Sequence, residues 1–185
     1  MRTIGLIGGM SWQSSKLYYG RINQLVAERR GGATSAQIII NSLDFAPIAR
    51  MQTEGRWKDA AAHLANAAQA LERAGADVIA IGANTMHKVA SQVMASVHVP
   101  LIHIGDTLVA GLRGHARSRP LLLGTRYTME DPFMIDHLAN KGIGALVPDK
   151  ADREALHAII YDELIKGVVT DKSRGTVLAM IERSS

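Results

Sequence analysis

The 185-residue sequence contains no cysteine, few aromatic residues and no apolar run long enough to cross a bilayer. The missing thiols exclude disulfides, thiolate metal ligands and a thiol nucleophile supplied by this sequence. Aromatic residues make up 4% of the total, and the basic residues behind the net charge of +4 are scattered among acidic ones. This pattern is not typical of a nucleic-acid-binding surface. We therefore expect a soluble, cytoplasmic protein with no nucleic-acid partner and no membrane segment.

The stretch VIAIGANTMH, residues 78–87, predicts a central strand and the loop that leaves it. Its continuous apolar run is typical of a strand buried on both faces of a parallel sheet. Ligands of such sheets bind just beyond the carboxyl ends of the strands. Ala83, Asn84, Thr85 and His87 follow the strand directly, so we expect them at a site. His87 could act as a base near neutral pH, but orienting the loop by hydrogen bonding is the simpler interpretation.

The first residues of the chain predict a strand, a glycine turn and a helix. The apolar run RTIGLIG ends at Gly8 and Gly9, and Ser11 is a good N-cap for a helix that stops near Gly31. Backbone amides at such a helix start form a natural anion site. The glycine spacing differs from G-x-G-x-x-G, so the turn predicts a small carboxylate or phosphate rather than a nucleotide.

Strands and helices alternate along the rest of the chain. Residues 36–43 predict a second strand, and residues 44–52 a loop, because Pro47 disfavours helix around it. Arg50 and Gln52 in this loop either reach the mouth of the site or are ordinary surface residues. We expect further helices over residues 57–74, 87–96, 107–112, 129–140, 153–166 and 173–182, and further strands over residues 99–104, 120–125 and 143–147.

The alternation predicts an α/β fold of two similar parallel-sheet domains related by pseudo-symmetry. We place the first domain at residues 1–98 and the second at residues 99–185. The second half of the sequence contains no strand equivalent to residues 78–81 of the first half. We therefore expect the second domain to lack its last strand. Apolar residues of the last helix would then be uncovered, which favours a homodimer or higher oligomer.

Four motifs occur in order along the chain: Gly8 to Trp12, Asp44 to Trp57, Ala83 to Lys88, and Leu123 to Met129. Together they resemble the aspartate/glutamate racemase family. The resemblance implies racemisation of an acidic amino acid, the small-molecule partner of this chain, without pyridoxal phosphate, metal or other cofactor. In that family one cysteine removes the α-proton, and a second cysteine returns a proton to the opposite face of the substrate.

The resemblance also implies site residues. The family's substrate contacts match Met10, Ser11, Gln52, Asn84, Thr85 and Thr125. Ala83 occupies the position of the first cysteine, and alanine has no proton to transfer. The second cysteine belongs to a Gly-Cys-Thr-Glu motif, which this sequence lacks.

We therefore expect an aspartate/glutamate racemase whose two-base chemistry is impaired in this chain. The alternatives are a non-catalytic carboxylate or amino-acid-binding protein and an inactive fragment. Relatives that decarboxylate substituted malonates need the second cysteine, so that activity is no better supported.

Overall fold

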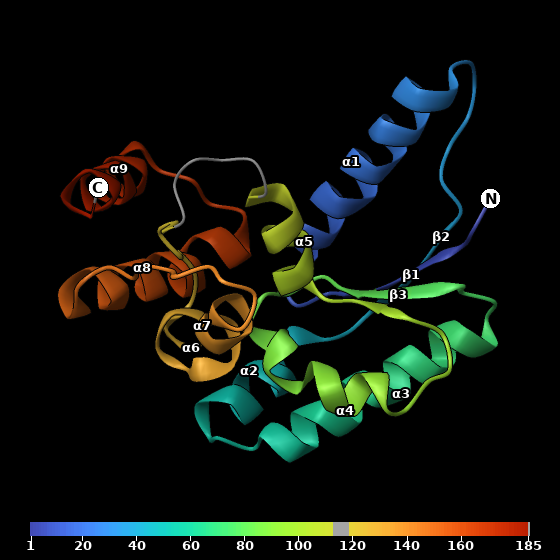
Figure 1. Ribbon diagram of the computed structural model, residues 1–185, viewed down its shortest axis with the longest axis horizontal. Coiled ribbons are helices and arrows are strands. Elements are labelled where there is room, and N and C mark those ends of the chain that lie inside the picture. Colours follow the sequence, from blue (N-terminus) through green and yellow to red (C-terminus); the bar gives the residue numbers. More distant parts are fainter. Residues whose placement is uncertain (113–118, 185) are drawn as a thin grey trace. The chain divides into compact units, whose positions relative to one another are not determined.

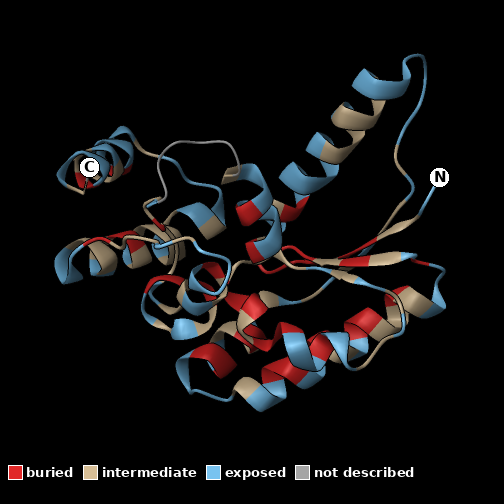
Figure 2. Cartoon of the chain, viewed as in Figure 1, coloured by how far each residue is buried: buried red, intermediate tan, exposed pale blue. Residues whose placement is uncertain are grey.

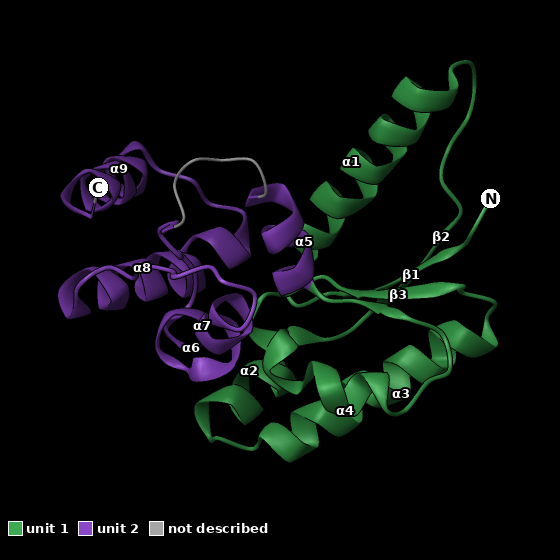
Figure 3. Ribbon diagram, in the orientation of Figure 1, with its two compact units in different colours: residues 1–103 green, residues 104–185 purple. Residues whose placement is uncertain are grey.

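The computed structural model describes residues 1–112 and 119–184, and the chain divides into two compact units, residues 1–103 and 104–185 (Figure 3). The first unit contains a four-stranded parallel sheet flanked by helices, and the second is mainly helical. The predicted α/β class is thus confirmed. The pseudo-symmetry and the domain limits 1–98 and 99–185 stay predictions. Within the described part of the chain, no helix has both the length and the apolar character that crossing a membrane requires.

The sheet of the first unit consists of β1 (Ile4–Gly8), β2 (Ile38–Ser42), β3 (Val78–Ile81) and β4 (Leu101–Ile102). The strand order is β2-β1-β3-β4, and every pairing is parallel. Because β1 lies between β2 and β3, the carboxyl ends of these three strands meet at one edge. β4 is shorter than the predicted strand over residues 99–104, since Pro100 has no N–H to donate to a ladder. It pairs with β3 and therefore belongs to the first unit.

The helices of the first unit are α1 (Trp12–Arg30), α2 (Phe45–Thr53), α3 (Trp57–Arg73), the 3₁₀ helix η1 (Thr85–Val89) and α4 (Ala90–Met94). Figure 1 shows α3 and α4 along one face of the sheet and α1 on the other. The predicted loop over residues 44–52 is wrong, because α2 occupies it. Asp44 caps this helix by accepting a hydrogen bond from the backbone N–H of Ala46 at 3.1 Å. Pro47 lies in the first turn, where its missing N–H costs no intrahelical bond.

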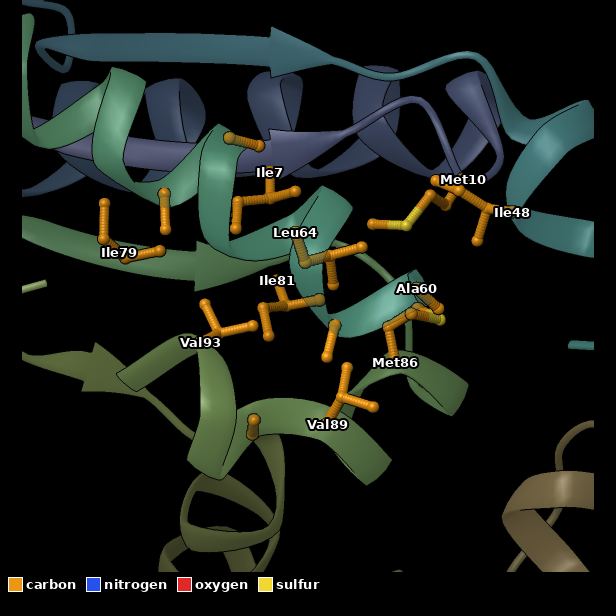
Figure 4. Packing of buried hydrophobic residues seen from close by; sticks show 14 of the residues in the cluster. Ile7, Met10, Ile48, Ala60, Leu64, Ile79, Ile81, Met86, Val89 and Val93 are labelled. Atoms are coloured by element: carbon orange, nitrogen blue, oxygen red, sulfur yellow. The ribbon is translucent and has the colours of Figure 1, made fainter. Parts of the chain in front are cut away.

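The main core lies between the sheet and α3 (Figure 2). Ile7 and Ile81 lie beside Leu64 of α3, with Ile79 farther back along β3 (Figure 4), and all four are buried. The helix approaches closely because β1 carries a glycine on this face. A Cβ atom on Gly5 would lie 3.1 Å from the Cβ of Leu71 in α3, and 2.8 Å from the Cβ of Ala76, which follows the helix.

We expect Gly5→Ala to lower the free energy of unfolding by about 1–3 kcal/mol, because the added methyl group overpacks this contact. Gly20→Ala in α1 is the matched control, since a Cβ there would meet nothing within 4 Å. It should be neutral or stabilise by up to about 1 kcal/mol through better helix propensity. Urea unfolding measures both, and equal effects of the two substitutions would contradict the close packing of α3.

The second unit contains α5 (Ile104–Leu112), α6 (Arg126–Glu130), α7 (Pro132–Ala139), α8 (Lys150–Asp162), the 3₁₀ helix η2 (Leu164–Lys166) and α9 (Asp171–Arg183). The predicted helix over residues 129–140 is interrupted at Asp131, because the residue before a proline favours extended backbone. In place of the predicted strands 120–125 and 143–147, the described residues form one parallel bridge, Leu121 with Leu146. Two such segments with no further strand beside them give a marginal sheet.

The last helix is only partly uncovered. Met180 is fully buried with Met129 and Leu156, whereas Leu178 is 55% exposed. The expectation that the apolar residues of this helix lie open is therefore wrong for Met180.

Candidate functional site

The turn after β1 is held in one conformation by its neighbours. Gly9 has φ +86°, and a Cβ atom there would collide with the backbone carbonyl of Leu43. The backbone N–H of Leu43 donates to the carbonyl oxygen of Gly8 at 3.0 Å. Only glycine combines this positive φ with so close a backbone contact. The glycine pair thus places the start of α1 directly at the end of the strand.

Ser11 precedes α1 with the extended backbone of an N-cap, as the sequence predicts, but its side chain does not cap the helix. The Ser11 hydroxyl is buried and has no hydrogen-bond partner among residues 1–112 and 119–184. In the same described part of the chain, nothing accepts a hydrogen bond from the backbone N–H of Met10 or Ser11. These donors lie at the positive end of a 19-residue helix. Their arrangement suits an anion.

The loop after β3 lies beside the turn after β1. Gly82 donates its backbone N–H to the carbonyl of Ile7 at 2.8 Å, and a Cβ on Gly82 would lie 3.8 Å from the Cα of Gly8. Asn84 and Thr85 follow at once. Thr85 is buried, and the Oδ1 atom of Asn84 is buried with no partner in the described part of the chain. Two neighbouring strand ends therefore each present an unpartnered side-chain oxygen.

His87 is buried and holds the loop from within. Its Nδ1 lies 3.1 Å from the carbonyl oxygen of Ala83 and must donate, because a carbonyl oxygen only accepts. Burial of the ring, with the ring of His103 4.9 Å away between centroids, lowers the pKa of His87 to about 4. The side chain is thus a neutral imidazole at pH 7. This contact favours the interpretation that His87 orients the loop.

The low pKa of His87 makes stability depend on pH. In the unfolded chain the His87 side chain has its ordinary pKa of about 6.5, whereas in the folded protein its pKa is about 4. The contribution of neutral His87 to the free energy of unfolding is therefore complete above pH 6.5 and is lost as the pH falls from about 6.5 to about 4. Between neutral pH and about pH 4.5 we expect a loss of about 2–3 kcal/mol from this group. Urea unfolding of wild type and His87→Gln should show a steeper acid loss for wild type; parallel pH profiles would contradict the assignment.

Gln52 and Met10 lie with the core beneath the site. Gln52 of α2 is 3% exposed, and its Nε2 donates to the sulfur of Met86 at 3.0 Å. Met10, Met86 and Ala83 belong to or pack against one apolar cluster. Arg50 is exposed. Of the two interpretations left open for the segment before α3, the structure thus buries Gln52 and leaves Arg50 at the surface.

Thr125 belongs to the second unit, residues 104–185. It is the N-cap of α6, and its hydroxyl accepts a hydrogen bond from the backbone N–H of Thr128 at 3.4 Å. A Cβ on Gly124 would lie 2.9 Å from the Cβ of Thr128, so the turn packs tightly. The part of Thr125 in substrate binding stays a prediction.

Sequence reasoning missed Ser15, one turn into α1. Its hydroxyl accepts a hydrogen bond from the backbone N–H of Gly9 at 2.9 Å. A serine four residues after an N-cap is common on solvated helix faces, so spacing alone does not reveal this contact.

The residues at these strand ends are neutral hydrogen-bonding groups. Ser11, Gln52, Asn84 and Thr85 offer hydroxyls and amides, which suit a carboxylate and an ammonium group better than a divalent cation. Ala83 contributes only a methyl group. The arrangement is therefore equipped to bind a small zwitterion, and it holds no side chain with an obvious proton-transfer role.

Comparison with known proteins gives a consistent answer. The family model for Asp/Glu/hydantoin racemases matches residues 7–185. A crystal structure of a Yersinia pestis protein assigned as an Asp/Glu racemase is 45% identical, with a TM-score of 0.88 over 99% of this chain and 80% of that one. An aspartate racemase homologue from Pyrococcus horikoshii is 36% identical, with a TM-score of 0.76 over 93% and 75% of the two chains.

A more distant structure shares the fold. The aspartate racemase of Picrophilus torridus is 17% identical, with a TM-score of 0.76 over 98% of this chain and 75% of that chain.

Proposed function

The chain belongs to the Asp/Glu/hydantoin racemase family, and on that premise we propose that it binds an aspartate- or glutamate-like amino acid. The site lies at the carboxyl ends of β1 and β3. The inherited reaction is cofactor-free α-proton transfer between two bases. Its rate is impaired here because alanine replaces the first base and the sequence has no cysteine for the second. The homodimer or higher oligomer and the cytoplasmic location stay predictions.

One observation supports this proposal: among residues 1–112 and 119–184, buried polar atoms at adjacent strand ends have no hydrogen-bond partner. The Ser11 hydroxyl and the backbone amides at the start of α1 are donors for a carboxylate. The Oδ1 of Asn84 is an acceptor for an α-ammonium group. A buried polar atom without a partner costs about 1–3 kcal/mol, so a ligand that satisfies both ends of the site recovers this energy.

Ligand binding is tested by thermal unfolding. We expect millimolar L-aspartate or L-glutamate to raise the Tm, because a ligand that binds only the folded state stabilises it. Succinate, which lacks the ammonium group, should raise the Tm less. Asn84→Ala should remove most of the shift by deleting the ammonium acceptor, whereas Asn66→Ala on the exposed side of α3 should preserve it. A wild-type Tm that neither amino acid changes would contradict substrate binding.

The chemistry is tested by restoring a thiol. Wild type should exchange the α-proton of aspartate in deuterated water barely faster than buffer, because Ala83 cannot accept a proton. Ala83→Cys should raise the exchange rate by about 100-fold, the low end of general base contributions, since a fraction of the thiol is ionised near neutral pH. Ala83→Ser is the matched control and should stay near wild type, because an unactivated hydroxyl is a poor base.

Proton NMR of the substrate separates the possible results. Rapid exchange by wild type would overturn the proposed impairment, and His87→Gln would then show whether the imidazole is the base. If Ala83→Cys binds aspartate but exchanges no faster than Ala83→Ser, residue 83 does not face the α-carbon. The chain would then be a binding protein whose ligand does not place its α-carbon beside residue 83.

A further inference from the structure

Ser15 connects α1 to the glycine turn through two hydrogen bonds. Its hydroxyl accepts from the backbone N–H of Gly9 at 2.9 Å and donates to the carbonyl oxygen of Ser11 at 3.3 Å. The side chain is buried, with 7% of the residue exposed. A single hydroxyl therefore bridges the residue before Met10 and the residue after it.

The turn packs closely against this bridge and against the chain leaving β2. A Cβ on Gly8 would lie 2.7 Å from the Ser15 hydroxyl oxygen, and a Cβ on Gly9 would collide with the backbone of Leu43. The turn is thus confined between Ser15 on one side and the chain leaving β2 on the other. Removal of the Ser15 hydroxyl would open one side of this confinement and free the Gly9 amide.

The bridge determines which amides remain available. Ser15 uses the N–H of Gly9, whereas the N–H groups of Met10 and Ser11 have no acceptor within residues 1–112 and 119–184. The Ser11 hydroxyl, also unpartnered and buried, lies in the same segment. Ser15 itself has both hydrogen-bonding roles filled by backbone, so it is not placed to bind a ligand.

We propose that Ser15 is a positioning residue that holds the Met10 and Ser11 amides and the Ser11 hydroxyl in the geometry that receives a substrate carboxylate. This inference rests on the proposed amino-acid site. Preorganised donors bind an anion more tightly, because they have already lost their conformational entropy during folding and do not lose it again on binding. The function of the hydroxyl is therefore affinity, in addition to any part in stability.

The test measures the Kd for L-aspartate by calorimetry at a temperature well below every Tm. We expect Ser15→Ala to raise the Kd about tenfold, because the free energy of one neutral hydrogen bond corresponds to roughly this change in affinity. Ser14→Ala, the same substitution one residue earlier, should leave the Kd unchanged. Ser15→Thr, which keeps the hydroxyl, should bind within about threefold of wild type. In the ligand-free protein, the ¹⁵N–¹H resonance of Gly9 should move in Ser15→Ala and not in Ser14→Ala.

Each result decides between the proposals. A lower Tm with an unchanged Kd in Ser15→Ala would make Ser15 purely structural and overturn the inference. Weak binding by both Ser15→Ala and Ser15→Thr would mean that side-chain size matters rather than the hydroxyl, which overturns it equally. If Ser15→Ala does not fold, Ser15→Cys makes a weaker hydrogen bond at similar size, and a wild-type Kd in that variant contradicts the inference. Failure of wild type to bind aspartate or glutamate removes the proposed function itself.

Discussion

The pairing of β1 with a strand on each side is the constraint on which the site depends. The N–H of Gly82 reaches back to the end of β1 on one flank, and the N–H of Leu43 does so on the other. The first of these backbone hydrogen bonds brings the loop at Asn84 to the turn at Gly9, and the second fixes the chain leaving β2 against the same turn, whatever side chains they carry. Parallel pairing thus provides the geometry, and the side chains determine which ligand the edge receives.

Binding and proton transfer depend on different atoms of this edge. The groups suited to a carboxylate are backbone amides and the Ser11 hydroxyl, which α1 and the glycine turn hold in place. The proposed proton-transfer position is residue 83, whose side chain packs against the apolar cluster. On this proposal, alanine at residue 83 would remove the base without disturbing any hydrogen bond of the turn. The proposed loss of the base is therefore compatible with retention of the groups proposed to bind the substrate.

Local sequence signals predicted most of the first unit and less of the second. Glycines at a positive φ and the run before Ala83 marked the strand ends, because their backbone and burial requirements are local. The sequence does not predict α2 because Pro47 disfavours helix around it, although proline is tolerated in a first helical turn. The strands at Leu121 and Leu146 were overpredicted, since apolar runs do not reveal how many neighbours a strand has. Ser15 was beyond reach because its role depends on a tertiary contact.

Ser11 and Asn84 each bury a side-chain oxygen that has no partner in the described part of the chain. An apolar side chain at either position would avoid the cost of a buried polar atom, so stability alone does not favour these residues. The first unit nevertheless satisfies the nearby backbone of Gly9 and Gly82 with short hydrogen bonds. The backbone of Gly9 and Gly82 is thus paired, whereas the amides of Met10 and Ser11 and the side-chain oxygens of Ser11 and Asn84 have no partner among residues 1–112 and 119–184. Paired backbone that holds unpaired polar groups in place is an arrangement that suits ligand binding.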